Sequence, residues 1–72
     1  MSVIAVVAEI DHVSRDIVKL QAAFQVTPKE QSDVREALRT EIVTLKAKRV
    51  ALFVALNESK IAEAVEALTQ GV

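Results

Sequence analysis

Residues 3–24 read VIAVVAEIDHVSRDIVKLQAAF, and the spacing of their large apolar side chains decides the fold. These side chains recur at alternating intervals of three and four, which is the heptad pattern of a helix that packs along one seam. A strand would need period two instead. We therefore expect a helix over about residues 2–25. Its seam consists of Val3, Val6, Ile10, Val13, Ile17, Leu20 and Phe24.

The single proline marks the end of this helix. Thr27 precedes Pro28, and a residue before proline is disfavoured in helical conformation. Thr27 is also a good N-cap, Pro28 suits a first helical position, and Glu30 completes a Thr-x-x-Glu capping box. We therefore expect a second helix over about residues 28–56.

This second helix carries two apolar stripes. The first stripe is interrupted by Arg49, and a second stripe runs beside it. Residues 50–56 are apolar without interruption, so this part of the helix should be buried on every side. The first stripe contains Val34, Leu38, Ile42, Leu45, Leu52 and Leu56, and the second contains Val43, Ala47, Val50 and Val54.

The polar run 57–60, Asn-Glu-Ser-Lys, leaves two alternatives for the C-terminal part. Asn57 or Ser59 could cap a short third helix over about residues 59–70. However, the second stripe also continues in phase through Asn57 to Ile61, Val65 and Leu68, as one unbroken helix would require. We favour a break near Asn57.

Composition limits how such a chain becomes stable. It has 72 residues, one histidine and no cysteine, so we expect one domain over residues 1–72, without disulfides or a thiolate metal site. Small proteins that lack disulfides and bound metals are usually stabilised by association with other chains. A net charge of -1 lacks the basic excess typical of nucleic-acid binding. No apolar run is long enough for a bilayer, and we expect a cytoplasmic location, cellular or viral-host.

The expected architecture is all-α. A long antiparallel helical hairpin, with Val3 level with Ala51 and Phe24 level with Glu30, is joined by a short third helix and assembled into a helical-bundle homo-oligomer. The loop end of this hairpin is charged and its open end is apolar, and the four large apolar side chains of the short helix are too few to cover the open end. The predicted protein interface is Val3, Ile4, Val7, Val50, Phe53, Val54, Ile61, Val65 and Leu68.

Three further features bear on chemistry. His12 and Asp16 are four residues apart on one helical face, but no nucleophilic side chain lies beside them. We therefore interpret the pair as part of a solvated helix flank. We expect the chain not to be an enzyme and not to bind a cofactor. Arg49, on the apolar stripe, has two interpretations: it sets register or selects a partner, with Glu9 or another chain supplying its carboxylate, or its aliphatic stem simply snorkels across the seam. Lys46, Lys48 and Arg49 together form the candidate nucleic-acid contact.

Segments 41–46 (EIVTLK) and 63–69 (EAVEALT) resemble short stretches of bacteriophage tail-fibre assembly chaperones and cover about a sixth of the chain. That resemblance adds a phage-encoded chaperone, or an inhibitor of a host protein, to the roles considered. The favoured function is a non-enzymatic protein–protein interaction module: an adaptor, assembly chaperone or inhibitor. The alternatives are a nucleic-acid-associated regulator, and an oligomer that binds a ligand in a pocket between subunits.

Overall fold

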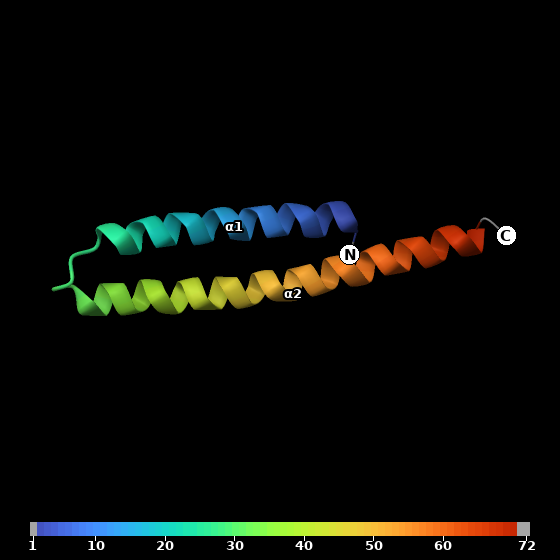
Figure 1. Ribbon diagram of the computed structural model, residues 1–72. Coiled ribbons are helices and arrows are strands. Elements are labelled where there is room, and N and C mark those ends of the chain that lie inside the picture. Colours follow the sequence, from blue (N-terminus) through green and yellow to red (C-terminus); the bar gives the residue numbers. More distant parts are fainter. Residues whose placement is uncertain (1, 71–72) are drawn as a thin grey trace.

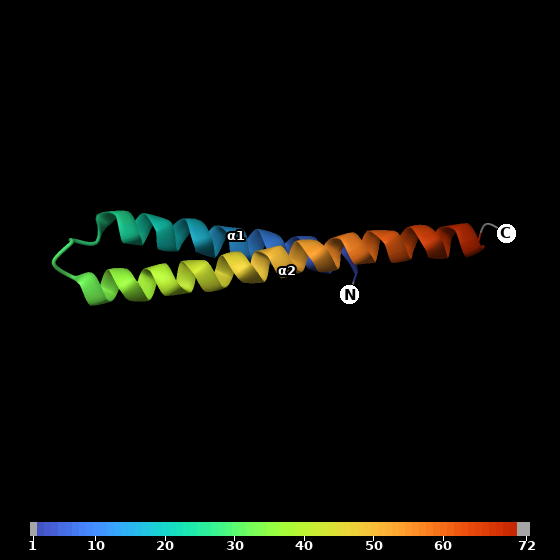
Figure 2. The ribbon, with the colours of Figure 1, turned by 60° about the horizontal axis from the view of Figure 1, so that its bottom comes forward.

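The computed structural model describes residues 2–70, which form two long helices joined by a short turn. Helix α1 spans Val3–Val26 and helix α2 spans Ser32–Gln70. The helices run antiparallel side by side, and α2 continues well beyond the N-terminal end of α1 (Figures 1 and 2). The molecule is a narrow rod with extents of 65 × 14 × 12 Å. The expectation of an all-helical chain is confirmed for the described residues.

Helix α1 follows its heptad seam closely. Ser2 caps its N-terminus, because the Ser2 hydroxyl accepts a hydrogen bond of 3.2 Å from the backbone N–H of Ala5. Of the seam residues, Val6, Val13 and Ile17 are buried against α2. The observed bounds lie within one residue of those that the apolar spacing predicts.

Thr27 ends α1 and does not begin α2. Its backbone is extended, with φ -76° and ψ 125°, as its position before Pro28 predicts. The Thr27 hydroxyl donates to the carbonyl of Ala23 at 2.6 Å, and the Thr27 N–H donates to the carbonyl of Phe24 at 3.3 Å. The predicted capping box with Glu30 is therefore wrong, because the hydroxyl is already bonded to the preceding helix.

A tight turn over residues 28–31 follows. It is closed by the N–H of Gln31, which donates to the carbonyl of Pro28 at 3.0 Å. The carbonyl of Gln31 then accepts the first bond of the next helix, from the N–H of Arg35 at 3.0 Å. Helix α2 consequently begins at Ser32 and not at Pro28.

The late start of α2 shifts the pairing of the two helices by about one turn. Lys48 lies level with Glu9, because its ammonium is 3.3 Å from the carboxylate of that residue. Counting six residues in each direction from this pair places Val3 level with Val54. The expected pairing of Val3 with Ala51 is therefore wrong, because the turn occupies residues that had been assigned to the helix.

The expected third helix is also wrong, because α2 continues without interruption through residues 57–60 to Gln70. This run contains neither Gly nor Pro, and Asn, Glu, Ser and Lys cost a helix interior only a few tenths of a kcal/mol each, up to about 0.7. We call residues 57–70 the tail. Its 14 residues extend about 21 Å at the standard helical rise and do not fold back over the open end.

Candidate interaction surface

One side of α2 packs on α1, and we call it the inner stripe. Its members alternate at intervals of three and four and are all partly buried. The stripe begins at Arg35 and not at the predicted Val34, which is exposed. No residue of α2 in the described chain is fully buried. The inner stripe comprises Arg35, Leu38, Ile42, Leu45, Arg49, Leu52, Leu56 and Ser59.

A second heptad series lies on the opposite side of α2, and we call it the outer stripe. Val54 is two residues from both Leu52 and Leu56, so about 200° of helical rotation separates it from each of these inner residues. Every member is exposed, including Val54 at 54% and Leu68 at 73%. The outer stripe comprises Val43, Ala47, Val50, Val54, Asn57, Ile61, Ala64 and Leu68.

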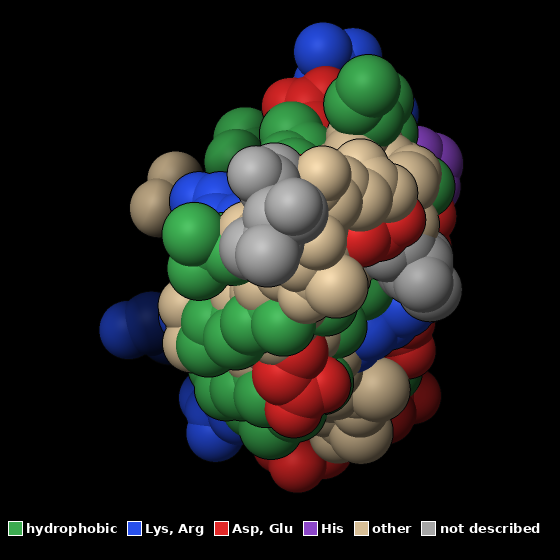
Figure 3. Space-filling model, turned by 90° about the vertical axis from the view of Figure 1, so that its right-hand side faces the viewer, with side chains coloured by type: hydrophobic (Ala, Val, Ile, Leu, Met, Phe, Trp, Pro, Cys, Tyr) green, Lys and Arg blue, Asp and Glu red, His purple; other side chains and the backbone are tan. Residues whose placement is uncertain are grey.

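The two sides of the hairpin differ in chemistry. On one side, a shallow hollow is lined by Gln21 and Phe24 together with Val43. Val7 precedes Gln21 by two heptads and therefore lies on this side. On the other side, Asp16 lines a hollow with Glu41. Figure 3, viewed along the rod, shows hydrophobic side chains towards its left and the histidine with acidic side chains towards its right.

The apolar side extends onto α1, where Ile4 is 84% and Val18 is 64% exposed. Of the nine residues predicted as the protein interface, eight are exposed, and Val3 is partly buried at the end of the seam. Exposed apolar side chains of this size and number are typical of a surface that contacts another chain. The contact itself stays a prediction.

The three clustered cations do not share one surface. Lys48 reaches Glu9 on α1, whereas Lys46 lines the hollow beside Phe24. These two lysines are two positions apart, which is about 200° of rotation. Arg49 is partly buried on the inner stripe. The carboxylate predicted for Arg49, that of Glu9, is thus bonded to Lys48, and the three cations form no continuous basic patch.

Arg35 holds the loop end of the hairpin together, and sequence analysis missed this role. Its guanidinium donates to the carbonyl of Thr27 at 2.9 Å and to that of Phe24 at 3.4 Å. It also lies 4.1 Å from the centre of the Phe24 ring. A cation is favourable at the negative end of α1, and the ring adds a cation–π contact. The sequence did carry a signal for this role: Arg35 lies three residues before Leu38 and therefore continues the inner stripe towards the turn.

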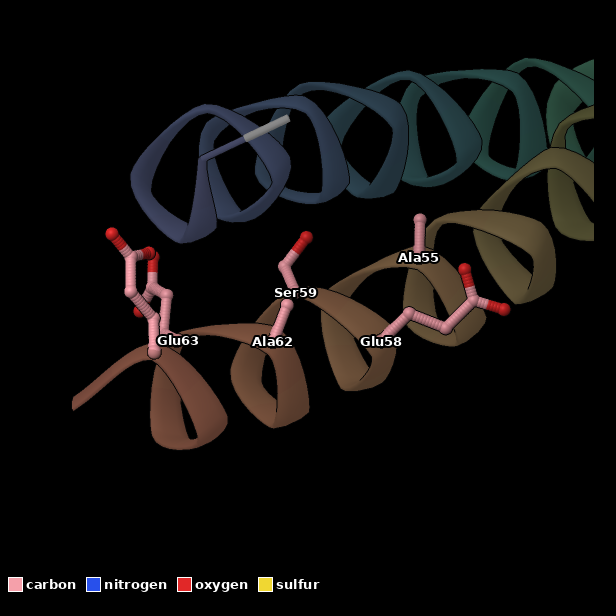
Figure 4. A pocket seen from close by; sticks show the side chains of 6 residues that line it. Ala55, Glu58, Ser59, Ala62 and Glu63 are labelled. Carbon is pink, nitrogen blue, oxygen red and sulfur yellow. The ribbon is translucent and has the colours of Figure 1, made fainter. Parts of the chain in front are cut away.

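A notch forms where α1 begins and the tail continues alone. It is lined by α2 residues only (Figure 4). Ser59 points from α2 towards the first turns of α1, and Glu63 lies near the end of α1. Beyond Ser59, the inner stripe continues as Glu63, Glu66 and Gln70, which are polar and exposed. The inner side of the tail is therefore hydrophilic, unlike its outer side.

The His12 imidazole is 3.4 Å from the Asp16 carboxylate, and their side chains are 70% and 39% exposed. Among residues 2–70, no three His, Asp or Glu side chains gather as a metal site would require. Over the same residues, neither helix combines the length and the apolar character needed to cross a bilayer.

Comparison of the chain with protein-family models finds no match, and comparisons with curated proteins and with solved structures find none either. Function is therefore inferred from the residues and their surroundings alone.

Proposed function

We propose that this chain is a non-enzymatic protein–protein interaction module that works as a homo-oligomer. Its role would be that of an adaptor, an assembly chaperone or an inhibitor that masks a partner surface. The observation that carries this proposal is the ratio of covered to uncovered apolar side chains. Only Val6, Val13 and Ile17 are buried, whereas twelve large apolar side chains in residues 2–70 are exposed.

A core of this size is small for a chain that must stay folded alone. Short chains rarely fold on a single core without disulfides, a metal or association, and this sequence has no cysteine. Fully burying one large apolar side chain contributes about 1.5–3 kcal/mol. Covering most of the twelve exposed residues would thus add more stability than the three buried residues supply. Association with further helices is the simplest way to cover them.

Helix-on-helix contact suits the shape of the exposed surface. The outer stripe is straight and regularly spaced, and helical partners recognise apolar anchors at such intervals. The polar groups on the rod are dispersed: His12 with Asp16 lies on an open flank, and the cations diverge. These features favour a binding role over a catalytic one.

The test is the absolute mass in solution, measured by light scattering after size-exclusion chromatography over about a hundredfold range of protein concentration. We expect a dimer or larger assembly of the 7.8 kDa chain, whose mass falls only at the lowest concentrations. Far-UV circular dichroism on the same samples reports whether the chain is folded. A helical, cooperatively unfolding monomer at every concentration would overturn the proposal.

A further inference from the structure

We infer that the outer stripe binds the outer stripe of a second copy, with the two α2 helices antiparallel. This inference rests on the proposed function, because it requires that the chain self-associates. It specifies which surface is used, what occupies it and in which direction the partner runs.

The first observation is the change of character along α2. Where α1 covers it, the inner stripe is apolar from Leu38 to Leu56 except at Arg49; from the start of α1 onwards, it becomes Ser59, Glu63 and Glu66. The outer stripe stays apolar past the same point, with Ile61 and Leu68 both more than half exposed. A partner of the tail therefore approaches from the outer side, not from the side that α1 occupies further along.

The second observation is the spacing of the outer stripe. Ala47, Val54, Ile61 and Leu68 follow one another at intervals of seven residues. A strict heptad repeat is the pattern by which two helices pack along a continuous seam. In α2 this seam has no partner within the described chain, since α1 lies on the opposite side. A helix with the same repeat would fit along it.

The third observation is the distribution of charge along α2, which favours α2 of another copy as that helix. Residues 43–56 contain Lys46, Lys48, Arg49 and no acid, a net charge of +3. Residues 57–70 contain three glutamates and Lys60, a net charge of -2. Lys48 is paired with Glu9 of α1, and Arg49, Glu63 and Glu66 lie on the inner side, so these charges do not meet at the outer stripe itself. Across the pair as a whole, an antiparallel arrangement places the positive half of each α2 beside the negative half of the other. A parallel pair would place like charges together, which is unfavourable.

Side-chain sizes fit the same direction. An antiparallel pair centred between residues 55 and 56 places Ala47 opposite Ala64 of the second copy and Val50 opposite Ile61. Val43 then faces Leu68 at each end. Asn57 from each copy lies within about one turn of the centre, where a polar side chain at a seam position can fix the register of a coiled coil.

The absence of cysteine from the chain allows a direct test by disulfide trapping. The variants are Ala47→Cys and Ala64→Cys, which leave every large apolar side chain in place. In the antiparallel pair, Cys at position 47 of one copy would meet Cys at position 64 of the other. Two copies of position 47 would lie about 25 Å apart along the axis, too far for a disulfide. Lys29→Cys, in the turn, measures the background from random collisions.

We expect mild oxidation to produce covalent dimers when the two variants are mixed, and only background amounts with either variant alone. Abundant dimers from each single variant would show parallel pairing and overturn the inference. A dimeric mass by light scattering without trapped dimers in the mixture would place the interface elsewhere, which also overturns the inference but leaves the proposed function standing. A monomeric mass would refute both.

Discussion

The two stripes of α2 share one helix and one repeat, yet within residues 2–70 only one of them has a partner. The inner stripe is covered by α1 and is rich in leucine, as at Leu45 and Leu52. The outer stripe is exposed and is rich in β-branched residues, as at Val50 and Val54. Periodicity therefore reports that a helix has two packing sides, but it does not report whether the same chain covers both.

The ends of the two stripes carry further information. The inner stripe loses its apolar character at Ser59, close to the level at which α1 begins. The outer stripe begins later, at Val43, and continues to Leu68, far beyond α1. Each stripe is thus apolar over its own interval of the helix. We take this offset as the mark of a second helical partner, placed further along α2 than α1 is.

The largest effect should come from a charge on the outer stripe. Ile61→Asp removes one apolar side chain from each copy at the proposed contact, about 1.5–3 kcal/mol per copy. The dissociation constant of a dimer should therefore rise by about 100-fold or more. Light scattering at several concentrations would measure this change.

Ala62→Asp is the matched control for that variant. It introduces the same charge one residue later, at a position that lines the notch on the inner side of the tail. We expect it to leave the mass unchanged. If both variants dissociated the assembly equally, added charge in the tail, and not the outer stripe, would be responsible.

A cavity on the inner side should have the next largest effect. Ile17 is only 2% exposed and is the largest of the buried side chains, so Ile17→Ala should lower the free energy of unfolding by about 2–5 kcal/mol. Urea denaturation at fixed protein concentration would measure it. The neighbouring Val18 is 64% exposed, and Val18→Ala should cost about 0.5 kcal/mol or less. Equal losses from the two would mean that Val18 is covered in the assembly.

Removal of the clamp at the loop end should have a smaller effect. Arg35→Ala loses two hydrogen bonds to carbonyls of α1 and the contact with the Phe24 ring. We expect a loss of about 1–3 kcal/mol, measured as a lower urea midpoint. Arg39 lies 5.7 Å from the same ring, and Arg39→Ala should cost less. A larger loss from Arg39→Ala would contradict the assignment of the clamp to Arg35.

Much of the architecture was predictable from the sequence because α1 is so regular. Its seam needs no knowledge of distant residues, and the Thr27-Pro28 break is local chemistry. Which helix Thr27 belongs to was not predictable, because a threonine hydroxyl can bond forwards as an N-cap or backwards to a carbonyl four residues earlier. In this chain it bonds backwards, and that choice moved α2 by one turn.

The errors in the candidate site have two causes, the polar run and the side of α2 on which each cation lies. Residues 57–60 look like a helix stop because they are hydrophilic, but polar residues on the surface of a helix do not interrupt it, and Asn57, Glu58 and Lys60 are exposed there. The partner predicted for Arg49 was chosen by its level along the hairpin alone, whereas Arg49 is partly buried on the inner stripe. With the observed register, Lys48 is the residue that meets Glu9. Exposure of the predicted interface could not be derived from periodicity, since it depends on where α1 stops.

The smallest effect should come from the pair of Lys48 and Glu9, in which a charge of α2 meets a charge of α1. Their side chains are 52% and 45% exposed, and surface pairs of this kind contribute about 0.2–1 kcal/mol. A double-mutant cycle with Lys48→Ala and Glu9→Ala should therefore give a coupling energy near the lower end of that range, and salt should reduce it.

The same two variants also test whether Lys48 faces the acidic tail of a second copy. In that case Lys48→Ala should weaken association more than Glu9→Ala does, because only the lysine would contact both chains. Equal effects of the two substitutions on the dissociation constant would restrict Lys48 to its contact within the hairpin.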